Sequence, residues 1–142
     1  MDFIPGIKMD FKLPDKRQFL ELFNTAGWNR YYKLSENDLY LALQNSWFII
    51  SAYQKERLIG FGRIISDGIA HALILDMIVH PEFQKRGIGS QILEIMVAKC
   101  KQHQIRDIQL FSAKDKPGFY LKHGFKIRPE NAPGMEIKNL PK

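Results

Sequence analysis

The apolar residues of this chain recur with two different periods, one typical of helices and one typical of strands. Spacings of three and four residues predict four helices. We expect these helices at residues 13–28, 35–46, 87–103 and 117–124. In the third, the apolar side is formed by Ile88, Ile92, Ile95, Met96 and Cys100. Asp15 and Ser35 are of residue types that favour a helix start, and Gly124 favours a helix end.

Alternating or continuous apolar runs between these helices predict strands. We expect strands at residues 7–13, 47–54, 57–66, 70–79, 107–112, 125–127 and 134–137. Short turns join the three middle strands, which indicates an antiparallel meander. The strand–helix–strand order from 70 to 112 favours a right-handed parallel crossover. The pattern therefore predicts a mixed sheet with helices, in a single domain over residues 1–142.

Composition and charge exclude several classes of protein. The chain has 142 residues and a net charge of +6, but its 21 lysines and arginines are scattered. They form no basic stripe interleaved with aromatic residues, so we expect no nucleic-acid partner. No apolar run approaches the roughly 20 residues that span a bilayer, so we expect no membrane association and a cytoplasmic location. No spacing of His, Cys, Asp or Glu indicates a metal site, and the lone Cys100 is expected in the core.

The turn in "HPEFQKRGIGSQIL" (80–93) carries the first sign of chemistry. A helix that starts directly after a strand leaves its first N–H groups unpaired and partly positive. Gly87 and Gly89 have no Cβ, so a ligand can lie on that backbone, and Lys85 and Arg86 add positive charge. The turn thus favours binding of an anion such as a pyrophosphate. The alternative is a strand-to-helix turn whose glycines only satisfy the geometry.

Two common phosphate-binding motifs do not fit this turn. In a dinucleotide fingerprint a third glycine would stand at the position of Ile92, and a Walker loop would need a G-K-[ST] sequence.

With the segment "GFYLKHGF" (118–125), "VHPEFQKRGIGSQIL" resembles the two signature segments of the GNAT N-acetyltransferases. "GFGRIISDG" and "PGMEI" make the chain similar to small bacterial and plastid-type members related to plant serotonin N-acetyltransferases. In that group Gly often stands where this chain has Lys85. The resemblance implies an α/β (α+β) fold, with a mixed, mostly antiparallel sheet and helices on both faces. It also implies a central splayed parallel strand pair, 70–79 and 107–112.

The resemblance further implies acetyl-CoA as the cofactor. Its pyrophosphate would be held by backbone N–H groups of Gln84, Lys85, Arg86, Gly87, Ile88, Gly89 and Ser90. Its pantetheine arm would lie against the backbone of Met77, Ile78 and Val79, with the thioester carbonyl near the Met77 N–H.

Acetyl transfer to an amine requires two proton movements. An alkyl amine with a pKa of about 10 must lose a proton before it attacks, and a thiolate whose thiol has a pKa of about 8.5 gains one on leaving. Tyr120 matches the tyrosine that serves as the acid in the resembled family. The alternative is an aromatic residue that packs a short helix under the sheet.

Asp76 is the candidate base, or the anchor of the amine. It stands alone in the apolar run 72–79, beside Met77. A carboxylate in such surroundings is costly unless it is paired or hydrogen-bonded. The alternative is a structural role, either in a salt bridge with Arg63 or in a backbone turn.

The acceptor is expected to meet residues of the segment 27–34. Trp28, Tyr31 and Tyr32 would form an aromatic wall and contact an ammonium group by cation–π interaction. Alternatively, these residues pack the first helix onto the sheet. Asp67 and Arg63 are further residues that would reach the acceptor cleft.

The sequence and the resemblance together predict an N-acetyltransferase that moves an acetyl group to a primary amine of a small molecule, by direct attack in a ternary complex. Two alternatives stay open: a non-catalytic CoA-binding sensor, and a transferase that acts on protein lysines or N-termini. Because dimers are common in the resembled family, a homodimer is a further expectation.

Overall fold

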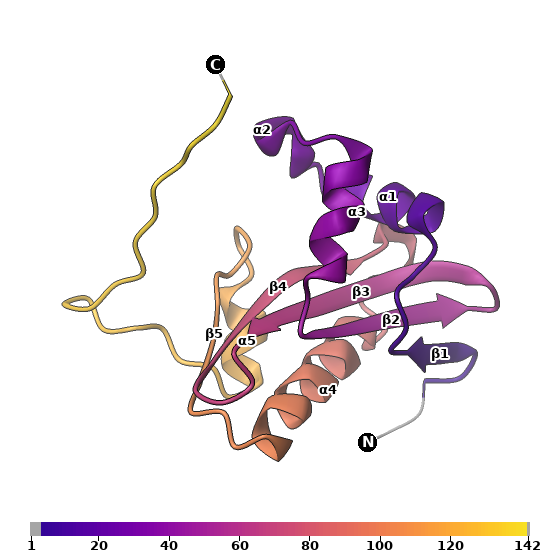
Figure 1. Ribbon diagram of the computed structural model, residues 1–142. Coiled ribbons are helices and arrows are strands. Elements are labelled where there is room, and N and C mark those ends of the chain that lie inside the picture. The colour runs from indigo at the N-terminus through magenta and orange to yellow at the C-terminus, as the bar shows by residue number, and fades with distance from the viewer. Residues whose placement is uncertain (1–3, 142) are drawn as a thin grey trace.

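The computed structural model describes residues 4–141 and shows one mixed sheet with helices on both faces (Figure 1). The strands are β1 (Ile7–Asp10), β2 (Phe48–Gln54), β3 (Arg57–Ser66), β4 (His71–Val79) and β5 (Asp107–Leu110). The helices are α1 (Lys16–Asn24), α2 (Asn29–Tyr32), α3 (Glu36–Gln44), α4 (Ile88–Gln102), α5 (Pro117–Lys122) and the 3-10 turn η1 (Pro81–Phe83).

The five strands lie in the order in which they occur along the chain, β1-β2-β3-β4-β5. The first four pair antiparallel, and only β4 and β5 pair parallel. This parallel pair needs a crossover, which α4 provides. The predicted meander, crossover and fold class are confirmed.

Two separate cores explain why helices cover both faces. One core packs α4 against the sheet and contains Ile92 and Met96, both without solvent exposure. The other packs α1 and α3 against the opposite face and contains Phe19 and Phe61. Cys100 lies in the first core as expected, and its burial raises the pKa of its thiol, which makes the thiol unreactive.

The predicted helix starts are confirmed by their hydrogen bonds. The carboxylate of Asp15 accepts a bond from the Gln18 N–H, and the hydroxyl of Ser35 accepts one from the Asp38 N–H. The short α2 was not predicted, because the segment 27–34 has no helical apolar period. Hydrogen bonds of Asn29 stabilise α2 instead: its side-chain N–H donates to the Leu34 carbonyl, and its side-chain oxygen accepts from the Leu34 N–H.

A β-bulge in β4 changes which face of the sheet its side chains reach. Between the pairs Phe61–Ile78 and Arg63–Leu75, β3 contributes one residue and β4 contributes two, Asp76 and Met77. Ile74 therefore packs toward α4, whereas Ile78, an even number of positions further on, packs toward α1. A regular strand would have placed both on one face.

The two strands predicted at 125–127 and 134–137 were wrong for this structure. Residues 125–141 contain no strand, and β5 is the last strand of the sheet among residues 4–141. Runs of three or four residues become strands only by pairing with a sheet edge, and these segments leave the edge of β5 unpaired. Among residues 4–141, no helix combines the length and the apolar character needed to cross a membrane.

Candidate active site

The parallel pair of β4 and β5 separates partway along β4. Its register runs from His71–Asp107 to Ile74–Leu110 and stops there, whereas β4 continues to Val79. The bulge at Asp76 lies two positions beyond the last paired residue, and among residues 4–141 no strand pairs with Met77–Val79 on the β5 side. The described chain thus has the splayed pair that the resemblance implied, with an exposed backbone edge suited to an extended ligand.

The start of α4 lies directly beyond this edge. Gly87 has a φ of +84°, a left-handed conformation that favours glycine, and no side chain caps the first turn. The N–H groups of Ile88, Gly89 and Ser90 have no acceptor among residues 4–141. An uncapped helix start of this kind is suited to an anion.

Gly89 faces the splayed edge rather than solvent alone. A Cβ placed on Gly89 would lie 3.6 Å from Cγ2 of Val79 and 3.7 Å from Cζ of Phe119, which is ordinary contact. Its φ is not positive, so alanine fits the backbone here. The fold without ligand therefore does not require a glycine at position 89.

The side chains around the turn support its shape. The Gln84 amide donates to the carbonyl of Val79 at 3.0 Å and thereby ties the turn to the end of β4. Lys85 has a φ of +64°, a left-handed backbone that glycine adopts more readily than lysine. The Arg86 guanidinium lies 5.1 Å from the centre of the Phe83 ring, in a cation–π contact.

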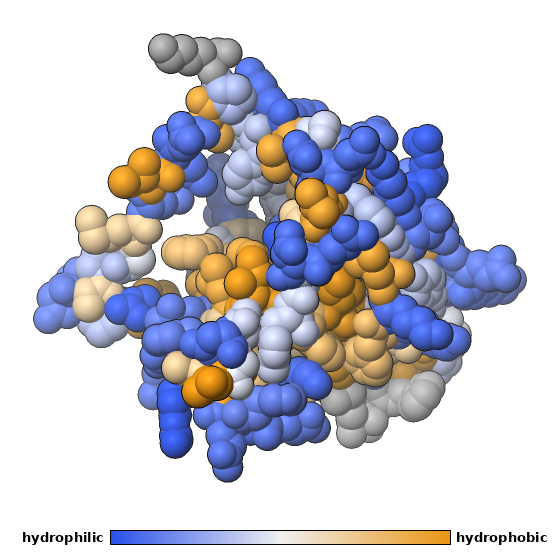
Figure 2. Space-filling view, viewed as in Figure 1, coloured by the Kyte–Doolittle hydropathy of each residue, from blue (hydrophilic) through white to orange (hydrophobic). Residues whose placement is uncertain are grey.

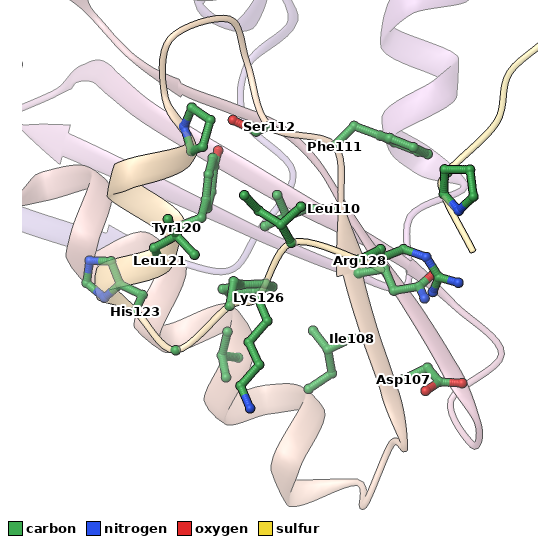
Figure 3. Close-up of a pocket in the computed structure, with 18 of the residues that line it drawn as sticks. Asp107, Ile108, Leu110, Phe111, Ser112, Tyr120, Leu121, His123, Lys126 and Arg128 are labelled. Atoms are coloured by element: carbon green, nitrogen blue, oxygen red, sulfur yellow. The ribbon is translucent and has the colours of Figure 1, made fainter. Parts of the chain in front are cut away.

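Tyr120 lies half-buried on α5, beside the end of β5. Its ring meets those of Phe119 and Phe125 edge-on, at centroid distances of 5.1 and 6.0 Å. Figure 3 shows its hydroxyl pointing toward Ser112, at the end of β5 where the strand pair has opened. Burial raises the pKa of the phenol above its ordinary value of 10.0, so that the group keeps its proton at neutral pH. Both readings of Tyr120, packing residue and proton donor, agree with this position.

A contact that the sequence did not reveal joins α5, the helix of Tyr120, to the first turn of α4. His123 on α5 lies with Nε2 3.0 Å from the Ser90 hydroxyl, in the first turn of α4. Its Nδ1 lies 3.8 Å from the Glu94 carboxylate. Ser90 and His123 are 33 positions apart, so no local sequence pattern indicates their contact.

Asp76 makes the salt bridge that was named as its alternative role. Nε of Arg63 lies 2.6 Å from Oδ2 of Asp76, and the two side chains are only 12% and 22% exposed. Nη1 of the same arginine contacts the Ala42 carbonyl at 3.4 Å and the Ser46 hydroxyl at 3.3 Å. The pair therefore connects the bulge of β4 to the end of α3. One carboxylate oxygen of Asp76 is engaged, and its candidate role in catalysis stays a prediction.

The three aromatic residues of the segment 27–34 share one cavity but differ in packing. Trp28 packs edge-on against Phe23 of α1 at a centroid distance of 5.8 Å, which is the packing role given as its alternative. Tyr31 and Tyr32 are exposed. Together they line a cavity of about 380 Å³ with Lys138 and Leu140 of the C-terminal segment. The Lys138 ammonium lies 5.9 Å from the Tyr32 ring centre, in the position expected of a cationic ligand.

Asp67 was expected to reach the acceptor cleft, but the structure engages its carboxylate in a turn. Its carboxylate accepts hydrogen bonds from the N–H groups of Ile69, Ala70 and His71, and these bonds lower its pKa. Asp67 therefore holds the turn between β3 and β4. Among the described residues 4–141, no three His, Cys, Asp or Glu side chains form a group that could hold a metal ion.

Comparison with known proteins agrees with this geometry. Residues 45–127 match the family model described as "Acetyltransferase (GNAT) domain", which is more than half of the chain. An N-acetyltransferase named ycf52 of Pyropia yezoensis, described as uncharacterized, is 35% identical over 119 residues, covering 81% of this chain and 67% of the relative. "Histone acetyltransferase TAP1" of Glycine max is 33% identical over 125 residues, covering 80% of this chain and 53% of the relative.

A solved structure shares the whole architecture. A GNAT-family acetyltransferase of Streptococcus pneumoniae is 26% identical and superposes with a TM-score of 0.76, over 94% of this chain and 98% of that one. The chain thus spans nearly all of a solved relative, about two thirds of the ycf52 protein and about half of TAP1.

The Arg63–Asp76 pair gives a prediction on stability. Replacing Arg63 by Met leaves a mostly buried carboxylate without its partner, and we expect a loss of about 2–3 kcal/mol of unfolding free energy. In the double variant Arg63→Met/Asp76→Asn the loss should be smaller than the sum of the single losses, because no lone charge remains. Asn tolerates the left-handed backbone of position 76, where φ is +53°. Urea unfolding of the four proteins measures the coupling, and additive losses would refute it.

Proposed function

The chain belongs to the GNAT acetyltransferase family, and from this premise we propose that it transfers the acetyl group of acetyl-CoA to a primary amine of a small molecule. The observation that carries the proposal is the splayed β4–β5 pair with the uncapped start of α4 at its end. The edge suits an extended amide-containing arm and the helix start suits a diphosphate, which are the two chemical parts of coenzyme A.

Acetyl-CoA supplies the activated acyl group when it is bound. On this proposal the N–H groups of residues 87–90 hold its diphosphate, and Lys85 and Arg86 add positive charge beside them. The backbone of Met77–Val79 orients its arm along β4, and the Met77 N–H donates a hydrogen bond to the thioester carbonyl. The residues present fit the cofactor, because both the helix start and the strand edge offer unpaired backbone groups.

Tyr120 is proposed as the residue that donates a proton to the departing sulfur. The raised pKa of its phenol supports this role in one direction only: a phenol that keeps its proton at neutral pH can donate it but cannot act as a base. Its place beside the opening of the strand pair puts the hydroxyl at the end of β5 (Figure 3). Phe119 and Phe125 fix the ring by edge-on contacts.

Asp76 is proposed as the anchor of the acceptor amine. Arg63 holds one of its oxygens, which leaves the other to accept a hydrogen bond from an ammonium or amine. The aromatic residues Trp28, Tyr31 and Tyr32 form the apolar side of the acceptor site. A cavity of about 380 Å³ is in the size range of small-molecule sites, which supports a small acceptor over a polypeptide.

A protein acceptor is the second candidate, because one relative is named as a histone acetyltransferase. A CoA-binding sensor without turnover is the third. One assay separates the three: free thiol released from acetyl-CoA in the presence of aliphatic and aromatic primary amines, of lysine peptides, or of no acceptor. We expect turnover with at least one small amine and little with peptides. Turnover with peptides alone would favour the second candidate, and binding with no turnover would favour the sensor.

Gly89→Ala tests the binding of the cofactor. The alanine fits the apo fold and is a better helix former, so stability without ligand should stay equal or rise by up to about 1 kcal/mol. The rise in melting temperature caused by CoA should fall, because the new methyl group stands where the diphosphate approaches the backbone. Gly118→Ala is the matched control, since Gly118 is also the second residue of a helix and has open space around it. An undiminished response of Gly89→Ala to CoA would overturn the proposed diphosphate site.

Tyr120→Phe tests the acid. Without the hydroxyl we expect kcat to fall by about 100-fold, with little change in the affinity for CoA. The wild-type rate should also decline as the pH rises above 10, where the phenol loses its proton, and the variant should lack this decline. Identical pH–rate profiles for both proteins would show that another group donates the proton.

A further inference from the structure

His123 lies between the two halves of the proposed site, although neither the binding of the cofactor nor the proton transfer described above makes use of it. It ends α5, its side chain is only 17% exposed, and its ring packs edge-on against Phe119 at a centroid distance of 5.0 Å. Phe119 in turn lies beside Gly89, with Cζ 3.7 Å from the position of a Cβ there. The imidazole is therefore held against the first turn of α4.

The two ring nitrogens of His123 face different partners. Nδ1 lies 3.8 Å from Oε1 of Glu94, and Nε2 lies 3.0 Å from the Ser90 hydroxyl. An ionised carboxylate accepts hydrogen bonds and cannot donate them, so Glu94 favours a proton on Nδ1. In the neutral ring Nε2 then carries only a lone pair, and the Ser90 hydroxyl donates its hydrogen to the ring.

Protonation of the ring reverses this hydrogen bond. In the imidazolium both nitrogens carry hydrogen, so Nε2 donates to the Ser90 oxygen. The hydroxyl hydrogen then turns away from the ring and is available to another acceptor. The N–H of the same residue is one of the backbone donors at the start of α4 that have no acceptor among residues 4–141. Ser90 thus offers two donors to an anion when His123 is charged and one when it is neutral.

The charges around His123 come mainly from cations. No acidic side chain of residues 4–141 other than Glu94 lies within 4.0 Å of a ring nitrogen, and Lys122 precedes His123 on α5. The cavity that His123 lines is also lined by other charged or titratable side chains, which are Lys101, Arg106, Asp107, Tyr120, Lys126 and Arg128. In Figure 3 Asp107 lies at the opposite end of this cavity, and the Lys126 side chain is directed away from His123. A bound diphosphate would add the negative charge that stabilises an imidazolium.

The ring can exchange its proton with solvent. In Figures 1 and 2 the C-terminal segment stands apart from the body, which leaves the cavity open on that side. Protonation of His123 therefore does not require the fold to open.

We propose that His123 couples the binding of CoA to the uptake of a proton, by turning the Ser90 hydroxyl toward the diphosphate. This coupling rests on the proposed function, because it takes the start of α4 as the diphosphate site. The charged state offers one more donor, so it binds more tightly, and the affinity falls as the pH rises through the range of about 5 to 8 in which histidine changes its charge. His123 is a positioning residue, since it acts through Ser90 and touches no reacting atom.

The dissociation constant of 3′-dephospho-CoA, measured against pH, tests the coupling. This probe lacks the phosphomonoester of CoA, which itself ionises near about pH 6, and its diphosphate keeps a constant charge. In the parent chain we expect the constant to rise about tenfold between about pH 5.5 and 7.5. In His123→Gln and in Ser90→Ala it should change by less than about twofold. Ser90→Ala keeps the imidazole, so a slope that persists in this variant would overturn the role of the hydroxyl.

His71→Gln is the matched control. His71 also faces a carboxylate, that of Asp107 at 3.3 Å, but it begins β4 and lies at the end of the strand away from the start of α4. This variant should keep the full slope. A slope lost equally in His71→Gln and His123→Gln would overturn the assignment to His123.

Calorimetry tests the coupling in the unsubstituted chain, so the result does not depend on how well a variant folds. Binding of 3′-dephospho-CoA near about pH 6.5, in buffers of different ionisation enthalpy, should take up a fraction of one proton. Normal binding without proton uptake would overturn the coupling and leave the proposed diphosphate site intact. Failure of that site gives a different result, because the probe would then bind Gly89→Ala as tightly as the parent chain at every pH.

Discussion

The left-handed backbone at Asp76 is the constraint on which the rest of the site depends. A residue other than glycine in this conformation costs about 1–2 kcal/mol, although Asp tolerates it better than most. The ion pair with Arg63 at 2.6 Å offsets this cost, and so does the burial of Ile78 on the opposite face after the bulge. The β4–β5 pairing ends two positions before this bulge, so the change of face in β4 lies where the sheet opens.

The bulge also explains why the two halves of the site face one another. Beyond it, Met77 and Ile78 pair with no strand of residues 4–141 on the β5 side, and Gln84 ties the following turn back to the Val79 carbonyl. The turn in this way starts α4 at the end of the opened edge. His123 completes the arrangement from the other side, because it joins the first turn of α4 to the helix that carries Tyr120. The groups assigned to the diphosphate and to the sulfur therefore lie on elements that contact each other directly.

Most of the fold could be read from the sequence, and the limits were physical. Periods of 3.6 and 2 located α1, α3, α4 and the five strands, because each of these buries one apolar face. The same pattern placed strands at 125–127 and 134–137, where the chain has apolar residues but pairs with no strand of residues 4–141. The apolar pattern indicates which face a segment can bury, whereas a strand forms only where the segment pairs with a sheet edge. The bulge lies at Asp76, a lone carboxylate in an apolar run, but only the pairing register of β3 and β4 reveals the extra residue.

The site residues also differ in how far their roles could be predicted from neighbouring sequence. The glycine turn could be found because its chemistry lies in consecutive residues, and the Arg63 partner of Asp76 could be named because a buried carboxylate requires one. The bond between Ser90 and His123 could not be found, because it joins residues 33 positions apart. Asp67 misled for the opposite reason: its partners are its own next neighbours, and a carboxylate that satisfies a turn looks in sequence like one that is free for substrate.

Lys85 shows how this chain balances backbone strain against charge. Its φ of +64° would suit glycine, and a lysine there costs about 1 kcal/mol of stability. In return the lysine brings a second cation to the start of α4, where Arg86 is already held against the Phe83 ring. Arg57 stacks on the same ring at 5.6 Å but is paired with the Glu82 carboxylate at 3.5 Å, so Lys85 and Arg86 are the two cations that the turn brings near a helix start without a capping side chain. Such an excess of positive charge is costly for an empty turn and is relieved by a bound dianion, which connects the strain at this position to the proposed diphosphate site.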